Sequence, residues 1–130
     1  MNSNRHNYSS NAPWEEKAAY SRAVKIDNQI FISGTTATDE NGNVVGKDDI
    51  YVQSCQCIEN IKSVLIKAGA SLNDIVRIRI FVTDISKWEI IAKALNEYFK
   101  DIKPAATMVE VQNLISPELF IEIEADAYIQ

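Results

Sequence analysis

Apolar and polar residues alternate along several short stretches of the chain, and this period of two predicts β-strands. The last stretch is the clearest, since Ile121, Ile123 and Ala125 alternate with Glu122 and Glu124. Apolar alternation and the turn residues between the stretches together predict five strands, over residues 19–25, 29–35, 75–82, 105–111 and 119–129.

Two longer stretches carry apolar residues at every third or fourth position, which is the period of an amphipathic helix. The first helix is predicted from about Asp48 to Ala68, and the second from Ser86 to the residues before Pro104. Ser86 and Glu89 have the spacing of a capping box at the start of the second helix. The expected buried stripes are Tyr51, Cys55, Ile58, Ile61, Leu65 and Ala68 in the first helix, and Trp88, Ile91, Leu95, Phe99 and Ile102 in the second.

The resulting order of elements, ββαβαββ, predicts an α+β fold whose two helices pack on one face of a sheet. Residues 18–130 are expected to form this single domain, and residues 1–17 a flexible N-terminal arm. The opposite sheet face would carry a mixed set of side chains: Arg77, Arg79, Phe81, Met108, Glu110, Glu122 and Glu124. Because burying unpaired charges is costly, we expect a partner subunit that covers the apolar members and lets the arginines neutralise the glutamates.

Charge and hydropathy argue against two classes of partner. The net charge is −5, the pI is about 4.8, and no cluster of lysine and arginine stands out. Since binding to phosphate backbones needs a basic face, we do not expect nucleic acid as a partner. No apolar run reaches the ~18 residues of a membrane span. The polar start, MNSNRHNYSSNAPWEEK, lacks the apolar stretch of a signal peptide, so we expect a cytoplasmic protein.

The cysteine and histidine content offers little for metal or nucleophile chemistry. Cys55 and Cys57 lie two apart on a predicted helix and point in different directions, whereas a zinc site needs about four converging ligands. The only histidine, His6, lies in the polar leader. We therefore expect no metal, reduced cysteines, and no serine or cysteine nucleophile activated by a histidine base.

Several motifs together resemble the Rid family of proteins, also called YjgF/YER057c/UK114. The matching stretches are AYSRAV, IFISGTTA, GASLNDIVRIRIFVTD, PAATMVEV and LISPELFIEIEADA. The resemblance extends from about Trp14 to Tyr128. It implies a chorismate-mutase-like fold, a homotrimer with clefts between subunits, and no cofactor. It also implies hydrolysis of reactive enamines and imines, such as 2-aminoacrylate, to 2-keto acids and ammonia.

The family resemblance also implies a set of site residues, with one departure. Tyr20, Ser33 and Gly34 match family positions that bind substrate, and Glu122 matches the glutamate that positions or activates water. In active deaminases the stretch after the proline reads PARSC, but here it reads PAATM, so the substrate-binding arginine is replaced by Ala106. Losing a charge-assisted hydrogen bond costs about 1.5–3 kcal/mol, which puts the usual deaminase reaction in question.

Each candidate residue also has a plain structural alternative. Tyr20 either orients a substrate or ends a packed strand, and Ser33 with Gly34 either holds a carbonyl or carboxylate or simply leads into a loop. Thr107 either offers a hydroxyl to the cleft or belongs to the core. Glu122 is either an acid–base group or one half of an ion pair between subunits. Arg22 shares a strand face with Tyr20, and we hypothesise that it supplies the cation missing at position 106.

Three functions follow from these alternatives. The chain is an enamine or imine hydrolase, or it binds a metabolite in the same cleft without turnover. The third alternative is the translation-inhibitor or endoribonuclease activity that older family names suggest. It is the weakest, because the chain is acidic and has no histidine suited to act as a base.

Overall fold

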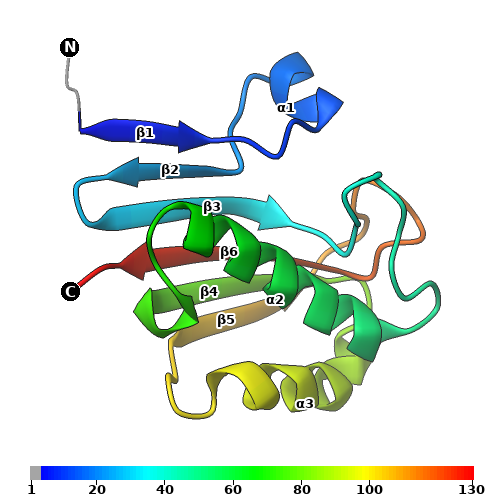
Figure 1. Cartoon of the computed structure of the whole chain (residues 1–130). Coiled ribbons are helices and arrows are strands. Elements are labelled where there is room, and N and C mark those ends of the chain that lie inside the picture. Colours follow the sequence, from blue (N-terminus) through cyan, green and yellow to red (C-terminus); the bar gives the residue numbers. More distant parts are fainter. Residues whose placement is uncertain (1–3) are drawn as a thin grey trace.

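The computed structural model describes residues 4–130 as one α+β domain, built on a six-stranded sheet with two long helices on one face (Figure 1). The strands lie in the order β1-β2-β3-β6-β4-β5, and neighbours are antiparallel except for the parallel pair β4 and β5. The elements are β1 (Arg5–Tyr8), α1 (Pro13–Lys17), β2 (Ala23–Ile26), β3 (Gln29–Thr35), α2 (Ile50–Lys67), η1 (Leu72–Asp74), β4 (Ile75–Val82), η2 (Ile85–Lys87), α3 (Trp88–Phe99), β5 (Ala105–Glu110) and β6 (Ile121–Tyr128). The expected α+β class is confirmed.

Helix α2 forms where the apolar period predicts it. The Asp49 side chain caps its first turn by accepting a hydrogen bond from the Val52 amide, at 3.1 Å. Ile58, Ile61 and Leu65 recur on one face and are fully buried against the sheet. Burying each such side chain stabilises the fold by roughly 1.5–3 kcal/mol, so this stripe fixes the helix on the sheet.

The start of the second helix differs from the prediction. Ser86 does not form the expected capping box, because its amide and hydroxyl both donate to Asp84 Oδ1, at 3.1 and 2.6 Å. The chain first makes the 3₁₀ turn η2, and α3 begins at Trp88. Trp88 was expected in the buried stripe but is 53% exposed, since it occupies the first turn while Ile91 and Phe99 carry the stripe onto the sheet.

The register of the sheet corrects two predicted faces. A bulge between Ile75 and Arg77 places Ile75 in the core and leaves Val76 exposed, although simple alternation back from Ile78 and Ile80 would bury Val76. In the β4–β5 pair Met108 lies beside Ile80, on the core face. Met108 and Glu110 therefore do not belong to the open sheet face. Glu110 instead accepts a hydrogen bond from the Ile85 amide at 2.9 Å.

The N-terminal segment is more regular than its composition suggests. Residues 5–8, predicted as part of a flexible arm, form the edge strand β1 beside β2, while residues 1–3 of that arm lie outside the described residues. Main-chain hydrogen bonds to β2 hold this strand in place of apolar side-chain burial. Its polar sequence therefore shows no apolar alternation. The next predicted strand begins late, at Ala23 instead of Ala19, because Ala19 has a φ of 60° and turns the chain.

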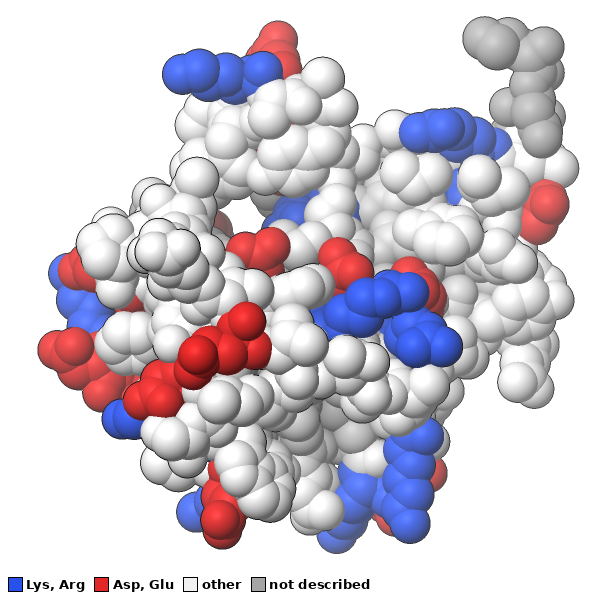
Figure 2. Space-filling view, turned by 180° about the vertical axis from the view of Figure 1, so that it is seen from behind, with Lys and Arg blue, Asp and Glu red and all other residues white. Residues whose placement is uncertain are grey.

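The sheet face away from the helices is open and mixed in character. Figure 2 shows acidic and basic side chains gathered over its middle, among large uncharged areas. Arg79 pairs there with Glu124 at 3.4 Å and with Asp126 at 3.2 Å, while Phe31 and Val109 are 45% and 42% exposed. Within residues 4–130, no helix is both long and apolar enough to cross a membrane.

Candidate functional site

Gly34, near the end of strand β3, and Glu122, near the start of strand β6, approach each other closely. The register between these strands shifts between Ile32 and Thr35. A Cβ atom at Gly34 would overlap Glu122 Oε2 and lie 2.9 Å from its Cδ. The φ of Gly34 is not in the left-handed region, so glycine is needed here for space. The absence of a side chain at Gly34 therefore makes room for the Glu122 carboxylate.

Arg22 reaches the same glycine from strand β2's side. Its Nη2 donates to the Gly34 carbonyl oxygen at 2.7 Å, and its guanidinium lies 5.9 Å from the centre of the Tyr20 ring. The backbone amide of Arg22 donates to the Tyr8 carbonyl at 2.8 Å, which ties the residue to β1. Its Nε is buried and has no hydrogen-bond partner. A cation and a carboxylate thus flank Gly34.

The environment of Glu122 favours its protonated form. Burial raises the pKa of Glu122, the Arg22 guanidinium opposes that rise, and the nearby Glu124 carboxylate adds to it; the net direction is upward. A carboxyl with a raised pKa holds its proton nearer to neutral pH, where it can donate to a substrate and accept a proton back. The group therefore suits acid–base chemistry.

Ser33 and Tyr20 lie near this pair with different degrees of freedom. The Ser33 hydroxyl donates to the Ser21 carbonyl at 2.6 Å, and its amide donates to the Arg22 carbonyl at 3.0 Å. Ser33 therefore has only acceptor lone pairs left for a ligand. Tyr20 precedes strand β2, and its side chain is 39% exposed. Of the predicted site residues, Tyr20, Arg22, Ser33, Gly34 and Glu122 come from neighbouring parts of one chain.

Thr107 is not brought to these residues within one chain. It lies exposed on the edge strand β5, beside Arg79 of β4. Strand β4 separates β5 from β6, so the spacing of roughly 4.8 Å between strands puts Thr107 about 10 Å from the strand that carries Glu122. Ala106, on the same edge strand, lines an open groove of about 270 Å³ against α3.

The thiols and the histidine stay outside this site. Burial raises the pKa of Cys57, and the Glu122 charge adds to the rise. Burial also raises the pKa of Cys55, although the nearby Tyr51 hydroxyl opposes that rise. Both thiols therefore remain protonated at neutral pH. His6 is exposed on β1. Among the residues that the structure describes, no group of three or more histidines, cysteines, aspartates or glutamates could hold a metal ion.

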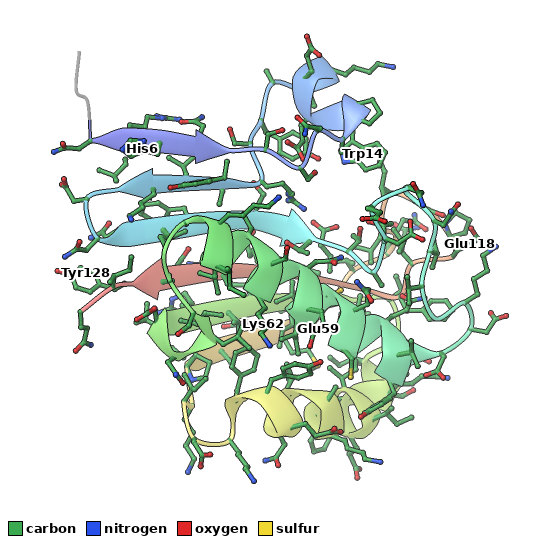
Figure 3. The ribbon with its side chains drawn as sticks, in the orientation of Figure 1. His6, Trp14, Glu59, Lys62, Glu118 and Tyr128 are labelled. Atoms are coloured by element: carbon green, nitrogen blue, oxygen red, sulfur yellow. The ribbon has the colours of Figure 1, made fainter. Side chains whose placement is uncertain are left out.

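One residue of α1, Glu15, was not indicated by the residue pattern. Glu15 is buried, and its carboxylate accepts hydrogen bonds from Ser9 and Ser10. Trp14 extends from α1 toward the loop after β3, where the Cβ of a residue replacing Gly42 would lie 3.5 Å from its ring (Figure 3). The signal for Glu15 was an acid in the first turn after a proline, preceded by two serines, but acids are common at helix starts.

An α+β domain with this architecture is also found in solved structures of YjgF/YER057c/UK114 proteins. A member from Mycobacterium tuberculosis superposes with a TM-score of 0.88 and 42% identity, over 96% of this chain and 99% of that one. The family model described as "Endoribonuclease L-PSP" matches residues 9–129. The chain therefore belongs to the YjgF/YER057c/UK114, or Rid, family, as its motifs predicted.

Two curated relatives extend this comparison. A RutC family protein from Pyrococcus abyssi is 40% identical over 109 residues, which are 84% of this chain and 85% of that protein. The 3-aminoacrylate deaminase RutC of Acinetobacter baylyi is 37% identical over 112 residues, or 86% of this chain and 88% of that protein.

Proposed function

We propose that this protein hydrolyses small reactive enamines or imines to carbonyl compounds and ammonia, in sites between the subunits of a homotrimer. The observation that carries the proposal is the placement of the Glu122 carboxylate and the Arg22 guanidinium against the same residue, Gly34. The name of the A. baylyi relative, a 3-aminoacrylate deaminase, supports the same substrate class.

The open sheet face supports the homotrimer. Phe31 and Val109 are large apolar side chains left exposed there, beside the ion pairs of Arg79. In one chain the Glu122 carboxylate has Gly34 and Arg22 beside it, while Thr107 lies on the distant edge strand β5. A neighbouring copy that presents its own β5 edge would supply the second wall of the cleft. Closed rotational symmetry would repeat this contact at each subunit.

The proposed reaction uses the Glu122 carboxyl twice. The protonated carboxyl donates its proton to the β-carbon of the enamine, and the C–N bond becomes an iminium double bond. The resulting carboxylate accepts a proton from a water molecule as the water oxygen bonds to the iminium carbon. Glu122 then passes this proton to the nitrogen of the carbinolamine. The C–N bond breaks and ammonia leaves, and the hydroxyl proton returns to the Glu122 carboxylate as the carbonyl forms. A raised pKa at Glu122 suits both transfers.

Arg22 is proposed to bind the substrate carboxylate in place of the arginine missing at position 106. Its Nη2 is already fixed on the Gly34 carbonyl, so the guanidinium is held at the site, with its remaining donors to offer a carboxylate. Arg22→Gln should then reduce the affinity for a carboxylate ligand at least tenfold, which corresponds to about 1.4 kcal/mol. Unchanged affinity would remove Arg22 from the site.

Binding without turnover is the second candidate function. The presence of Ala106 at the position of the family arginine favours it. Alanine cannot make the two-pronged contact by which the family arginine orients a carboxylate. Under this alternative the same cleft holds a metabolite but does not position it for attack by water.

A coupled assay separates the two functions. A dehydratase generates 2-aminoacrylate or 2-aminocrotonate, and the release of keto acid is followed with and without the purified protein. Acceleration that Glu122→Gln abolishes, while the matched exposed variant Glu118→Gln retains it, supports the hydrolase. Absence of acceleration, together with a rise in melting temperature on adding 2-oxobutyrate, supports the binding protein. Cleavage of RNA that persists through further purification would contradict both.

A further inference from the structure

Glu15 is a buried acid without a role in the proposed reaction. It is 4% exposed and is the only Asp, Glu, Lys or Arg among the buried residues of the described chain. Its Oε1 accepts a hydrogen bond from the Ser9 hydroxyl at 2.8 Å, and its Oε2 accepts one from the Ser10 hydroxyl. The Ser10 amide lies 3.3 Å from each of the two oxygens. This cage holds the carboxylate in one place.

The cage keeps Glu15 ionised. Burial raises the pKa of Glu15, but the hydrogen bonds from Ser10 and Ser9 and the charge of Arg22 lower it, and the lowering prevails. A buried charge persists only where hydrogen bonds and opposite charge compensate for lost hydration. At neutral pH α1 therefore presents a fixed negative charge to Arg22.

Glu15 is also connected through the backbone to the residues of the site. Its carbonyl oxygen accepts a hydrogen bond from the Tyr20 amide at 2.9 Å, which closes the turn leading to β2. Arg22 is within electrostatic range of two carboxylates, Glu15 on α1 and Glu122 on β6. Among residues 4–130 no ion pair within 4.0 Å joins Arg22 to either of them. Its Nη2 donates a hydrogen bond to the Gly34 carbonyl oxygen instead.

We propose that Glu15 is a positioning residue: its buried carboxylate holds the Arg22 guanidinium at the Gly34 carbonyl, so that Arg22 stays available to a substrate carboxylate instead of pairing with Glu122. The inference rests on the proposed function in taking Arg22 as the substrate anchor.

Removing the charge of Glu15 would leave Arg22 attracted mainly to Glu122. The charged and titratable groups that act with Glu122 are Arg22, Glu124 on β6 and the buried Cys57 thiol on α2. Of these, only Arg22 is a cation. Its closer approach would lower the pKa of Glu122 and occupy the donors that bind substrate. Glu15 therefore acts on the site through Arg22.

The test compares Glu15→Gln with Glu16→Gln in the full chain. Glu16 is the adjacent acid on the same helix and is exposed, so it matches the change in charge without the cage. Glutamine is isosteric with glutamate, and its one carbonyl oxygen can still accept a hydrogen bond from one of the two serines. The titration of the Glu122 carboxyl is followed by carbon-13 NMR, and the affinity for 2-oxobutyrate, the product of 2-aminocrotonate hydrolysis, is measured by NMR titration.

Glu15→Gln is expected to lower the pKa of Glu122 and to weaken 2-oxobutyrate binding at least tenfold, while Glu16→Gln changes neither. In an Arg22→Gln background, Glu15→Gln should have no further effect, because the coupling runs through Arg22. If the two variants behave alike, or if the effect of Glu15→Gln persists without Arg22, the inference is wrong. The titration of Glu122 needs no turnover, so loss of the proposed hydrolase function would leave this part of the test intact.

Discussion

Replacing Gly34 with alanine should displace the Glu122 carboxylate while leaving the fold nearly unchanged. The new Cβ would overlap Oε2 and lie 2.9 Å from Cδ and 3.4 Å from Cγ of Glu122. Carbon atoms in good contact are about 3.5–4.0 Å apart, so the carboxyl group must retreat by roughly 1 Å. The atoms in conflict belong to the end of a flexible side chain, and the backbone at Gly34 has an ordinary φ.

The expected effects on stability and on activity differ greatly in size. Moving Glu122 off its preferred rotamer costs about 0.5–1.5 kcal/mol, and the lower entropy of the unfolded alanine chain returns about 0.4–1 kcal/mol. The net change is within about 1 kcal/mol, or a few degrees in melting temperature. A displacement of 1 Å in a catalytic group costs about 100-fold in rate, which is about 2.7 kcal/mol.

The assay measures kcat/KM for 2-aminocrotonate and the melting temperature on the same preparation of Gly34→Ala. The double variant Gly34→Ala/Glu122→Ala is the control, since it removes the group with which the new methyl collides. Its melting temperature should equal or slightly exceed that of Glu122→Ala alone, because alanine lowers the entropy of the unfolded chain. Activity within twofold of the unmodified protein, or a loss of stability that remains in the double variant, would refute the assigned geometry.

Three further predictions concern Glu122, Gln53 and Ala106. Because the folded-state pKa of Glu122 is raised, the folded chain binds this proton more tightly than the unfolded chain, and stability is lost as pH rises from about 4.3 through the folded pKa. In urea titrations, the free energy of unfolding of Glu122→Gln minus that of the unmodified chain should therefore be larger at pH 7 than at pH 4. The same difference at both pH values would contradict this. Gln53 is fully buried, and its side chain hydrogen-bonds the Gly46 and Glu118 carbonyls and the Phe120 amide. Gln53→Ala should therefore lower the free energy of unfolding in urea by at least about 2 kcal/mol. A loss near zero would show that these backbone groups find other partners. Ala106→Arg should accelerate hydrolysis of 2-aminoacrylate about tenfold or more by restoring a carboxylate contact; no gain in kcat/KM would mean that position 106 does not face the substrate.

The sequence predicted those parts of the fold where one face of an element is buried. The alternation from Ile121 to Ala127 and the stripe from Ile58 to Leu65 both reappear as buried residues. Strand β1 was missed because main-chain hydrogen bonds, not burial, hold its residues. The faces of β5 were assigned wrongly, since five of its six residues are exposed and its register depends on pairing with β4.

The candidate site was predictable only in part, for a similar reason. The motifs indicated Gly34 and Glu122 one by one, and the structure adds that they touch. Arg22 bonds the Gly34 carbonyl where the register between β3 and β6 shifts, and such a shift leaves no mark in the residue pattern. The burial of Glu15 depends on how α1 folds back over the serines, and a single acid in a polar segment gives no hint of it.

The association of three chains is the claim on which the proposed site depends. Light scattering on the purified protein, followed through serial dilution, measures it directly. We expect a molar mass near three times the 14.6 kDa of one chain, maintained at micromolar concentration. A mass of a single chain under these conditions would leave the open sheet face uncovered and the cleft without its second wall, and would contradict the account.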